Sequence, residues 1–552
     1  MTKKHIPVLV VGLLIVLVAL AGGTVYGINK LIPSRKQMDL TEYYGQNADG
    51  EAALILGTEK LEEKALISGE DVYLPLDVVN GYLNQRYYWD SENKKILYAT
   101  PSSLTEEPAS DKADGNVWLK DDTVYLKLDY VKKYTDIDSY IEQDPARVAI
   151  QYKFTNVETV TTKKDTVIRY RGGIKAPILS KLAKNTVLRL MNEGEDWDQV
   201  ATDDGYIGYV QKKKVSAVDT TDYERDFKTE SYTYLTMDEP VNLAWHQVTS
   251  TDANSYFADA VQNMTGVNVI SPTWFSVTDN SGNISSLASG EYVMQAHEKG
   301  LKVWGLVDNF NENMSTTEVL SKTSSRQNLE NQLITYALKA GLDGINVDFE
   351  SLSEGVGIHF LQFLRELSIQ CHANNLVLSV DNPVPEDFTS HYDRAEQGKV
   401  VDYVIIMGYD EHYVGSEEAG SVASLPWVEK GIQDTIAEVP AQRVINAVPF
   451  YTRLWKTEAG SLSSEAIGMD TAQEVVNTNN AQVYWDSDVS QNYGSFEKDG
   501  CTYQIWIEDS QSIAAKVQLV QKYNLAGVAA WKLGFENSSI WQVITDNLSA
   551  SN

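Results

Sequence analysis

Apolar runs of strand length alternate with helical segments between residues 230 and 548. The clearest helical periodicity lies at 327–340 and 357–373. Short apolar runs joined by helices are typical of parallel strands with crossover connections, and eight such strands close into a barrel with its active site at their carboxyl ends. The pattern therefore predicts a (β/α)8 TIM barrel over 230–548. The eight runs are 241–245, 267–271, 302–307, 344–349, 376–380, 401–407, 443–448 and 527–531.

The interval between the seventh and eighth apolar runs is the longest. Within it, residues 455–524 contain a strand-like stretch at 502–507 and a helical stretch at 510–523. Crossovers of a barrel are usually shorter than this. We expect part of the interval to form an inserted α+β lobe beside the active site.

The segment 37–160 contains an internal repeat. Its motif Val-Tyr-Leu-Pro-Leu-Asp at 72–77 recurs as Val-Tyr-Leu-Lys-Leu-Asp at 124–129, and each copy continues with a short helix and further strands. This pattern predicts two α+β modules. They resemble the stalk-like repeat called the copper amine oxidase N-terminal domain. The name implies no copper here, because neither copy contains a histidine.

Residues 163–219 form a run of short strand-like stretches. The order of a turn, Trp197-x-x-Val, Asp-Gly and then Gly-Tyr-Val at 208–210 resembles bacterial SH3-like modules, which often bind cell-wall peptide. We therefore expect a small β-barrel with a cell-wall peptide as a candidate partner. A spacer in which Trp197 is simply packed is an equally open interpretation.

The amino terminus indicates where the protein acts. Residues 6–28 are 23 consecutive uncharged residues preceded by Lys3 and Lys4, long enough to form a transmembrane helix. A cleaved signal peptide is the alternative. We expect a single membrane anchor with the bulk of a bacterial protein outside the cell, and the presence of only two cysteines fits bacterial export.

The composition argues against several classes of partner and cofactor. The formal net charge of −31 argues against nucleic acid as a partner. The seven histidines show no metal-ligand spacing, so we expect neither a metal nor a cofactor.

The most informative stretch, 343–350, contains the fourth apolar run and reads Asp-Gly-Ile-Asn-Val-Asp-Phe-Glu. Side chains alternate along a strand, so Asn346, Asp348 and Glu350 share one face, which we expect to point into the barrel. Inward acids are costly unless they are paired or functional, and a polar ladder that only joins neighbouring strands is the alternative. Asp343, which precedes Gly344, would lie on the opposite face at the start of the strand. We therefore expect it to have a structural role and not a catalytic one.

This stretch resembles the Asp-x-x-Asp-x-Asp-x-Glu signature of glycoside hydrolase family 18, the chitinase-like barrels, with Asn346 where many members have Asp. Residues 407–410, Met-Gly-Tyr-Asp, resemble the family's Met-x-Tyr-Asp. Trp531 ends the eighth run, where the family has a tryptophan beneath the sugar. The longer runs 407–413 and 425–429 look most like the peptidoglycan-directed branch with the spore-cortex N-acetylglucosaminidases.

The resemblance implies a retaining, substrate-assisted hydrolase that cuts β-1,4 bonds at N-acetylglucosamine in peptidoglycan or chitin-like glycans. Glu350 would protonate the leaving oxygen and later activate water. Asp348 would accept a hydrogen bond from the acetamide N–H, and Tyr409 would donate one to the acetamide oxygen. The implied substrate-binding residues are Met407, Asp410, Trp531 and, as a neutral hydrogen-bond partner of Asp348, Asn346.

Other residues at strand ends are further candidates. Trp245 and Trp274 either line the substrate site or pack in the core. The pairs 308–309 and 381–382, each Asp-Asn, are candidates for contacts with sugar hydroxyls. A catalytically weak or inactive glycan-binding surface protein is the alternative function, although the presence of Glu350 argues against it.

Overall fold

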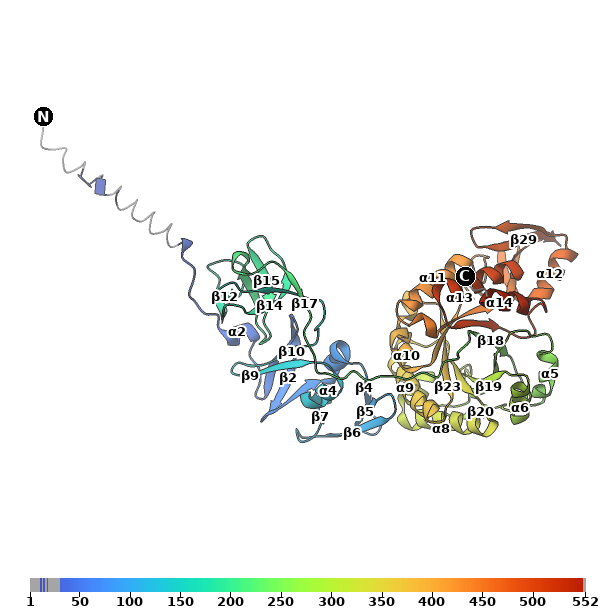
Figure 1. Ribbon diagram of the computed structural model, residues 1–552, viewed down its shortest axis with the longest axis horizontal. Coiled ribbons are helices and arrows are strands. Elements are labelled where there is room, and N and C mark those ends of the chain that lie inside the picture. The colour runs from blue at the N-terminus through green and yellow to red at the C-terminus, as the bar shows by residue number, and fades with distance from the viewer. Residues whose placement is uncertain (1–9, 12, 15–16, 18–29, 550–552) are drawn as a thin grey trace, which may run out of the picture. The chain divides into compact units, whose positions relative to one another are not determined.

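The computed structural model describes residues 10–11, 13–14, 17 and 30–549. The chain divides into two compact units (Figure 1). The front unit comprises the residues up to 89 together with 94–96 and 106–229, and the barrel unit comprises 90–93, 97–105 and 230 onward. Within the described residues, no helix is long and apolar enough to cross a membrane. The predicted span at 6–28 falls mostly outside those residues, so it stays a prediction.

The internal repeat builds a ten-stranded sheet, most of which belongs to the front unit, ordered β4-β5-β6-β7-β8-β3-β2-β1-β10-β9. The two copies of the repeated motif pair antiparallel, with Leu74 opposite Leu126. Each copy continues into a short helix, α3 (Leu76–Val78) or α4 (Leu128–Tyr134). The predicted α+β repeat is therefore folded as one shared sheet. Its strands are β1 (Glu51–Leu56), β2 (Glu59–Ser68), β3 (Asp71–Pro75), β4 (Tyr87–Asp90), β5 (Lys95–Ala99), β6 (Leu104–Ser110), β7 (Val117–Lys120), β8 (Thr123–Lys127), β9 (Asp138–Gln143) and β10 (Ala146–Gln151).

A seven-stranded antiparallel sheet follows in the front unit, ordered β13-β12-β16-β15-β14-β11-β17. It contains the short strands expected from the sequence, and its apolar side chains form a small core around Ile168, Leu188 and Val200. The resemblance to SH3-like modules and their peptide ligand stays a prediction. The strands are β11 (Val157–Thr161), β12 (Thr166–Arg169), β13 (Ile178–Leu182), β14 (Val187–Asn192), β15 (Trp197–Ala201), β16 (Ile207–Gln211) and β17 (Asp219–Thr221).

The barrel unit contains a closed ring of eight parallel strands, which confirms the predicted TIM barrel. The ring runs β18-β31-β25-β24-β23-β22-β21-β19, and a further pairing between β18 and β19 closes it. All eight apolar runs of the sequence are strands. They are β18 (Val241–His246), β19 (Val269–Val277), β21 (Lys302–Asp308), β22 (Gly344–Asp348), β23 (Val377–Pro383), β24 (Tyr403–Met407), β25 (Val444–Pro449) and β31 (Gly527–Trp531).

Helices surround this ring (Figure 1). The two helices with the clearest sequence periodicity are present as α8 (Thr323–Ala340) and α9 (Gly357–Ala373). Asp393 and Asp509 begin two other helices by accepting hydrogen bonds from backbone N–H groups. The remaining helices of the unit are α5 (Phe257–Ala260), α6 (Gly290–Glu298), α7 (Thr316–Ser321), α10 (Arg394–Val400), α11 (Leu425–Ile436), α12 (Met469–Thr478), α13 (Ser510–Tyr523) and α14 (Ile540–Ser549).

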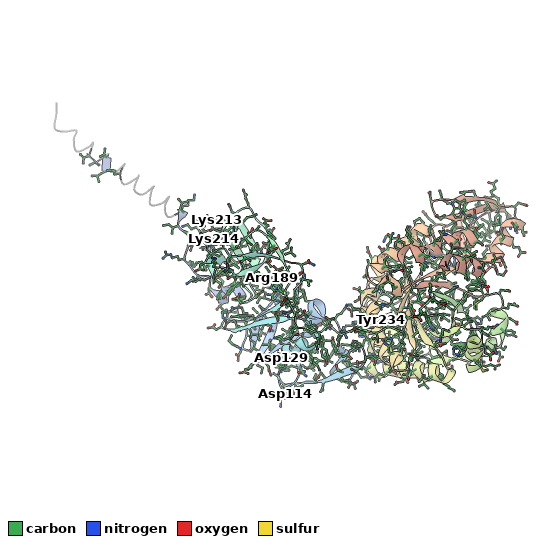
Figure 2. The ribbon with its side chains drawn as sticks, in the orientation of Figure 1. Asp114, Asp129, Arg189, Lys213, Lys214 and Tyr234 are labelled. Atoms are coloured by element: carbon green, nitrogen blue, oxygen red, sulfur yellow. The ribbon has the colours of Figure 1, made fainter. Side chains whose placement is uncertain are left out.

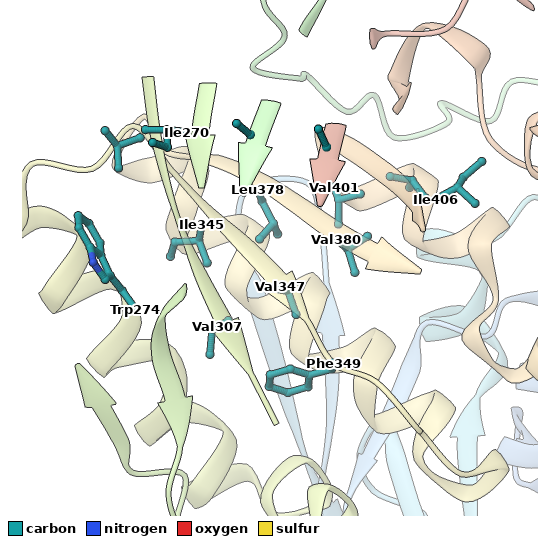
Figure 3. Close-up of a cluster of buried hydrophobic side chains, with 14 of the residues drawn as sticks. Ile270, Trp274, Val307, Ile345, Val347, Phe349, Leu378, Val380, Val401 and Ile406 are labelled. Carbon is teal, nitrogen blue, oxygen red and sulfur yellow. The ribbon is translucent and has the colours of Figure 1, made fainter. Parts of the chain in front are cut away.

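Strand β22 shows how the core positions the site. Ile345, Val347 and Phe349 belong to the large apolar cluster between strands and helices (Figure 3). Its other face points into the barrel, where an inner cluster includes Trp245 and Trp304. The prediction of which β22 side chains face outward and which face into the barrel is therefore correct. Packing of the outward residues fixes the direction of the polar residues between them.

The inserted lobe is an antiparallel five-stranded sheet, ordered β27-β26-β30-β29-β28, with α12 packed on one side. The lobe begins at Tyr451, two residues after the end of β25, and its last strand ends at Ile507. The lobe thus occupies part of the interval 455–524 and starts four residues before it, and the helix at 510–523 is the crossover that leads into β31. The lobe strands are β26 (Tyr451–Glu458), β27 (Ser461–Gly468), β28 (Gln482–Asp486), β29 (Gln491–Lys498) and β30 (Cys501–Ile507).

Candidate active site

A ladder of polar side chains follows the inner face of β22. Asn346 is fully buried, Asp348 is 6% exposed, and Glu350 lies just beyond the strand, half-buried. The start of the strand requires glycine, because a Cβ on Gly344 would lie 2.8 Å from the Trp304 ring. The strand therefore delivers its two carboxyl groups toward the carboxyl end of the barrel, where substrates of this fold bind.

Asp343 has a structural setting at the opposite end of the strand. Its carboxylate accepts hydrogen bonds from the Val303 N–H at 2.9 Å and from Lys302 Nζ at 2.9 Å, and it contacts His297 Nε2 at 2.7 Å. All three partners lie on β21 or on α6, which precedes it. These bonds hold β22 against its neighbour.

Asn346 joins four strands of the barrel. Its carboxamide oxygen accepts two hydrogen bonds, and its nitrogen donates two. The oxygen accepts from Trp245 Nε1 (2.9 Å) and Ser271 Oγ (3.3 Å), and the nitrogen donates to Ser379 Oγ (3.0 Å) and Asp381 Oδ1 (2.8 Å). The expected bond between Asn346 and Asp348 is absent, because these partners already occupy both ends of the amide.

Asp348 has an unused hydrogen-bond acceptor. Its Oδ1 is buried and has no partner. Burial raises the pKa of Asp348 well above its ordinary value, and the negative charges of Asp381 and Glu350 raise it further. A buried acceptor without a donor is costly in the free protein, so this oxygen favours a ligand that brings an N–H or O–H group.

Glu350 is held through its main chain by Asn309, which directly follows β21. The Glu350 N–H donates to Asn309 Oδ1 at 2.9 Å, and Asn309 Nδ2 donates back to the Glu350 carbonyl at 3.0 Å. The next residue, Ser351, has a left-handed φ of 52°. Burial raises the pKa of Glu350, and the charges of Asp410 and Asp308 raise it further. These features suit a carboxyl group that must keep its proton until substrate arrives.

Two further acids lie level with Asp348 on the neighbouring strands β21 and β23. Asp308 pairs in register with Asp348, is 9% exposed, and accepts hydrogen bonds from Ser276 Oγ at 2.8 Å and the Phe310 N–H at 3.2 Å. Asp381 is buried against Asn346. Burial raises the pKa of both acids. Their main contacts are with the protein, so the structure gives no support to the expected contacts with sugar hydroxyls.

The end of β24 contributes a second group of side chains. Met407 and Tyr409 are partly buried, and Tyr409 packs against the inner cluster of the barrel. Burial raises the pKa of Tyr409 well above its ordinary value, which keeps its hydroxyl protonated as a donor. Asp410 is open to solvent, and its Oδ1 accepts a hydrogen bond from the Tyr451 hydroxyl at 2.6 Å. Although the residue is exposed, the protein atoms packed around its carboxyl group partly desolvate it and raise the pKa of Asp410.

The three candidate tryptophans lie in different environments. Trp531 ends β31 partly exposed, so one side is available to a ligand. Trp245 is 1% exposed and hydrogen-bonded to Asn346, so it supports the ladder from within the core and lines no substrate site. Trp274 is also 1% exposed, donates to Asn254 Oδ1 at 2.9 Å and packs against Tyr292. Both indoles therefore pack in the core, which is the second of the two interpretations that the sequence left open.

Sequence reasoning missed Tyr451 and the part that Asn309 plays. Tyr451 lies two residues beyond the end of β25, and its position after the seventh apolar run was the only available signal. Asn309 was singled out for its place after a strand, but the hydrogen bonds to Glu350 depend on the shapes of two loops. No spacing in the sequence predicts them.

Comparison with known proteins agrees with this geometry. The model of glycosyl hydrolases family 18 matches residues 206–536, more than half of the chain. That range includes all eight barrel strands and the inserted lobe.

Three curated relatives come from Bacillus subtilis. The uncharacterized glycosylase YvbX is 27% identical over 292 residues, covering 51% of this chain and 84% of YvbX. The putative sporulation-specific glycosylase YdhD is 31% identical over 39% of this chain and 53% of its own length. The cortical fragment-lytic enzyme is 25% identical over 42% of this chain and 56% of its own length. The chain thus spans only about half of the last two relatives.

Solved structures share the fold. A chitinase from Chromobacterium violaceum superposes with a TM-score of 0.51 at 22% identity, covering 56% of this chain and all of that one. The Bacillus cereus spore cortex-lytic enzyme SleL superposes with a TM-score of 0.52 at 19% identity, covering 59% of this chain and 78% of its own.

Proposed function

Because the chain belongs to glycosyl hydrolase family 18 and is a glycoside hydrolase, we propose that it cleaves β-1,4 bonds at N-acetylglucosamine by a retaining, substrate-assisted mechanism. In this mechanism the acetamide oxygen of the substrate attacks its own anomeric carbon, so the protein needs no carboxylate nucleophile. The protein must then supply an acid and a group that orients the acetamide.

The observation that carries this proposal is the buried, unpartnered Oδ1 of Asp348. An acetamide N–H is a donor of the kind that this oxygen lacks. The hydrogen bond would turn the acetamide oxygen toward the anomeric carbon, and it would strengthen as positive charge develops on the acetamide group. Asp348 is thus the proposed orienting and charge-stabilising residue.

Glu350 is the proposed general acid and base. Its raised pKa keeps a proton available for the leaving glycosidic oxygen. Once the leaving group has departed, the ionised carboxylate takes a proton from the incoming water. Tyr409 donates its hydroxyl proton in a hydrogen bond to the acetamide oxygen, and its high pKa keeps that donor available.

The remaining residues shape the sugar site. Trp531 provides an apolar surface for the pyranose ring. Asp410, supported by Tyr451, offers an acceptor to a sugar hydroxyl at the end of β24. Met407 contributes apolar contact beside them.

The proposed substrate is peptidoglycan, with chitin-like glycans as the second candidate. Relatives named as a cortical fragment-lytic enzyme and a sporulation-specific glycosylase favour the first, and the likeness to a chitinase keeps the second open. Mass spectrometry of products from purified peptidoglycan and from chitin oligomers distinguishes them. We expect muropeptides from the former at a higher rate. Cleavage of chitin oligomers alone would overturn the assignment to peptidoglycan.

We also propose that the enzyme acts outside the cell, attached to the membrane through residues 6–28. The support is the uncharged run of 23 residues and the extracellular position of the proposed substrate. Treating intact cells with protease tests this location: digestion of the barrel unit is expected, and full protection would contradict it.

A further inference from the structure

The front unit contains a cavity of about 610 Å³. Its lining comes from β9, from β13 and β14 and from the loop at 202–204, so both sheets of the front unit contribute to it. The volume lies in the range of about 300–1,000 Å³ that is usual for small-ligand sites. The cavity lies wholly within the front unit, outside the proposed active site.

The lining of the cavity includes a buried amide that has no hydrogen-bond partner. Gln151 is 4% exposed, and neither its Oε1 nor its Nε2 makes a hydrogen bond. An unpaired buried amide is unfavourable in the free protein. The side chain has no hydrogen bond to break, so it can turn toward a ligand in the cavity without losing a protein contact.

Three of the five charged side chains that line the cavity form ion pairs, and the other two, Lys181 and Asp204, have opposite charges. Arg189 (labelled in Figure 2) donates hydrogen bonds to Asp203 Oδ1 at 3.2 Å and to the Lys153 carbonyl at 2.8 Å. Asp138 is held by Arg225. Because these charges are already compensated, the cavity favours a neutral, polar ligand over a charged peptide.

Aromatic side chains form the walls. Phe154 and Tyr223 line the cavity, and Tyr140, 39% exposed, also lines it and is open to solvent. Aromatic surface next to polar donors and acceptors is the combination that a sugar ring needs, since a pyranose has apolar C–H faces and a polar rim.

We infer that this cavity is a second glycan-binding site that takes one acetamido sugar of the chain, with Gln151 as the residue that recognises its N-acetyl group. The acetamide N–H can donate to the free Gln151 Oε1, while Gln151 Nε2 donates to a neighbouring hydroxyl of the same sugar, so one Gln side chain can satisfy both kinds of group. The ligand class rests on the proposed function. The cavity and its unpaired amide do not.

Such a site would keep the enzyme on its substrate. Two sites on one chain raise the effective concentration of the polymer at the second site once the first is occupied. Long glycans would benefit from this effect, whereas oligomers too short to reach both sites would not.

Hydrogen exchange of the full chain, followed by mass spectrometry, tests this inference. The background carries Glu350→Gln to prevent hydrolysis, and the probe is N-acetylchitotetraose. We expect protection in β9–β10 and β13–β14 as well as at the ends of β22 and β24. Gln151→Leu should raise the apparent Kd read from the front-unit segments about tenfold, as expected for lost hydrogen bonds in a buried site, and leave that of the barrel segments unchanged.

Two further variants make the result decisive. Gln46→Leu, an exposed position of the front unit outside the cavity, is the matched control and should change neither Kd. Val187→Trp, at an exposed lining position, should remove front-unit protection by filling the cavity. The inference is overturned if the tetraose protects only the barrel, if both cavity variants bind normally, or if tetra-alanine protects the front unit while the tetraose does not. Failure of the proposed function would appear separately, as absent protection of the barrel segments.

Discussion

Asn309 and Glu350 hold each other by a reciprocal pair of hydrogen bonds between one side chain and one main chain. The Asn309 carboxamide accepts from the Glu350 N–H at 2.9 Å and donates to the Glu350 carbonyl at 3.0 Å. Asn309 also donates to Thr316 Oγ1 at 2.9 Å, which anchors it to α7. Glu350 lies beyond the last residue of its strand, so this pair replaces the support that the barrel sheet no longer gives.

The first prediction concerns this support. Asn309→Ala should lower kcat about tenfold, the effect of about 1.4 kcal/mol of lost transition-state positioning, and leave KM nearly unchanged. Asn309→Asp keeps the acceptor but adds a negative charge beside Glu350, so it should also move the alkaline limb of the rate profile to higher pH. Steady-state kinetics over a range of pH measures both effects. Asn313→Ala, exposed in the same loop, is the control. A change in KM alone would show that Asn309 does not position Glu350.

The second prediction follows from the raised pKa of Glu350. A general acid works only while protonated, so kcat/KM should fall as pH rises through this pKa, which lies above the ordinary value for Glu. Asp308 contributes to the upward shift, and Asp308→Asn removes that charge. The pKa of Glu350 should then fall, and the alkaline limb should move to lower pH.

Asp259→Asn, on the exposed side of α5, serves as the comparison for this experiment. It should leave the profile in place. An unshifted alkaline limb in Asp308→Asn would mean that Glu350 does not set it.

The barrel strands were predictable because their apolar runs are short and the segments between them are helical. The alternation of side chains along β22 also predicted which residues face inward, since packing of Ile345, Val347 and Phe349 fixes the orientation of the strand. These properties depend on local sequence and on the alternation of side chains. They need no knowledge of distant contacts.

The features that the sequence left undecided concern contacts between distant segments. Trp274 and Trp531 follow the same pattern, an aromatic residue near the end of an apolar run. Strand β19 continues to Val277 and pairs with β20 (Ile284–Ser286), so Trp274 becomes packed under α6 while Trp531 stays partly open. Similarly, the partners of Asn346 come from three other strands, and no spacing near Asn346 indicates them.

The third prediction concerns stability at the junction of the lobe and the barrel. Lys516 on α13 and Glu508 form a fully buried ion pair, with N–O distances of 2.9 and 3.0 Å. Lys516→Met leaves Glu508 buried without its cation, and we expect a loss of about 3–5 kcal/mol in the free energy of unfolding. Chemical denaturation measures it.

The same helix provides the control. Lys522 also forms an ion pair, with Glu429, but it is 58% exposed. Lys522→Met should therefore cost only a small fraction of the loss seen for Lys516→Met. Equal effects of the two substitutions would contradict the importance of burial at this junction.

The most direct test of the proposed mechanism is the anomeric configuration of the first product. Proton NMR during hydrolysis of N-acetylchitotetraose by the full chain should show the β-anomer first, with the α-anomer appearing only through mutarotation. The de-N-acetylated tetramer should stay uncut, and Glu350→Gln should lower turnover of the acetylated one at least a hundredfold. Initial release of the α-anomer, or cleavage of the de-N-acetylated tetramer at a similar rate, would contradict substrate-assisted catalysis by Asp348 and Glu350.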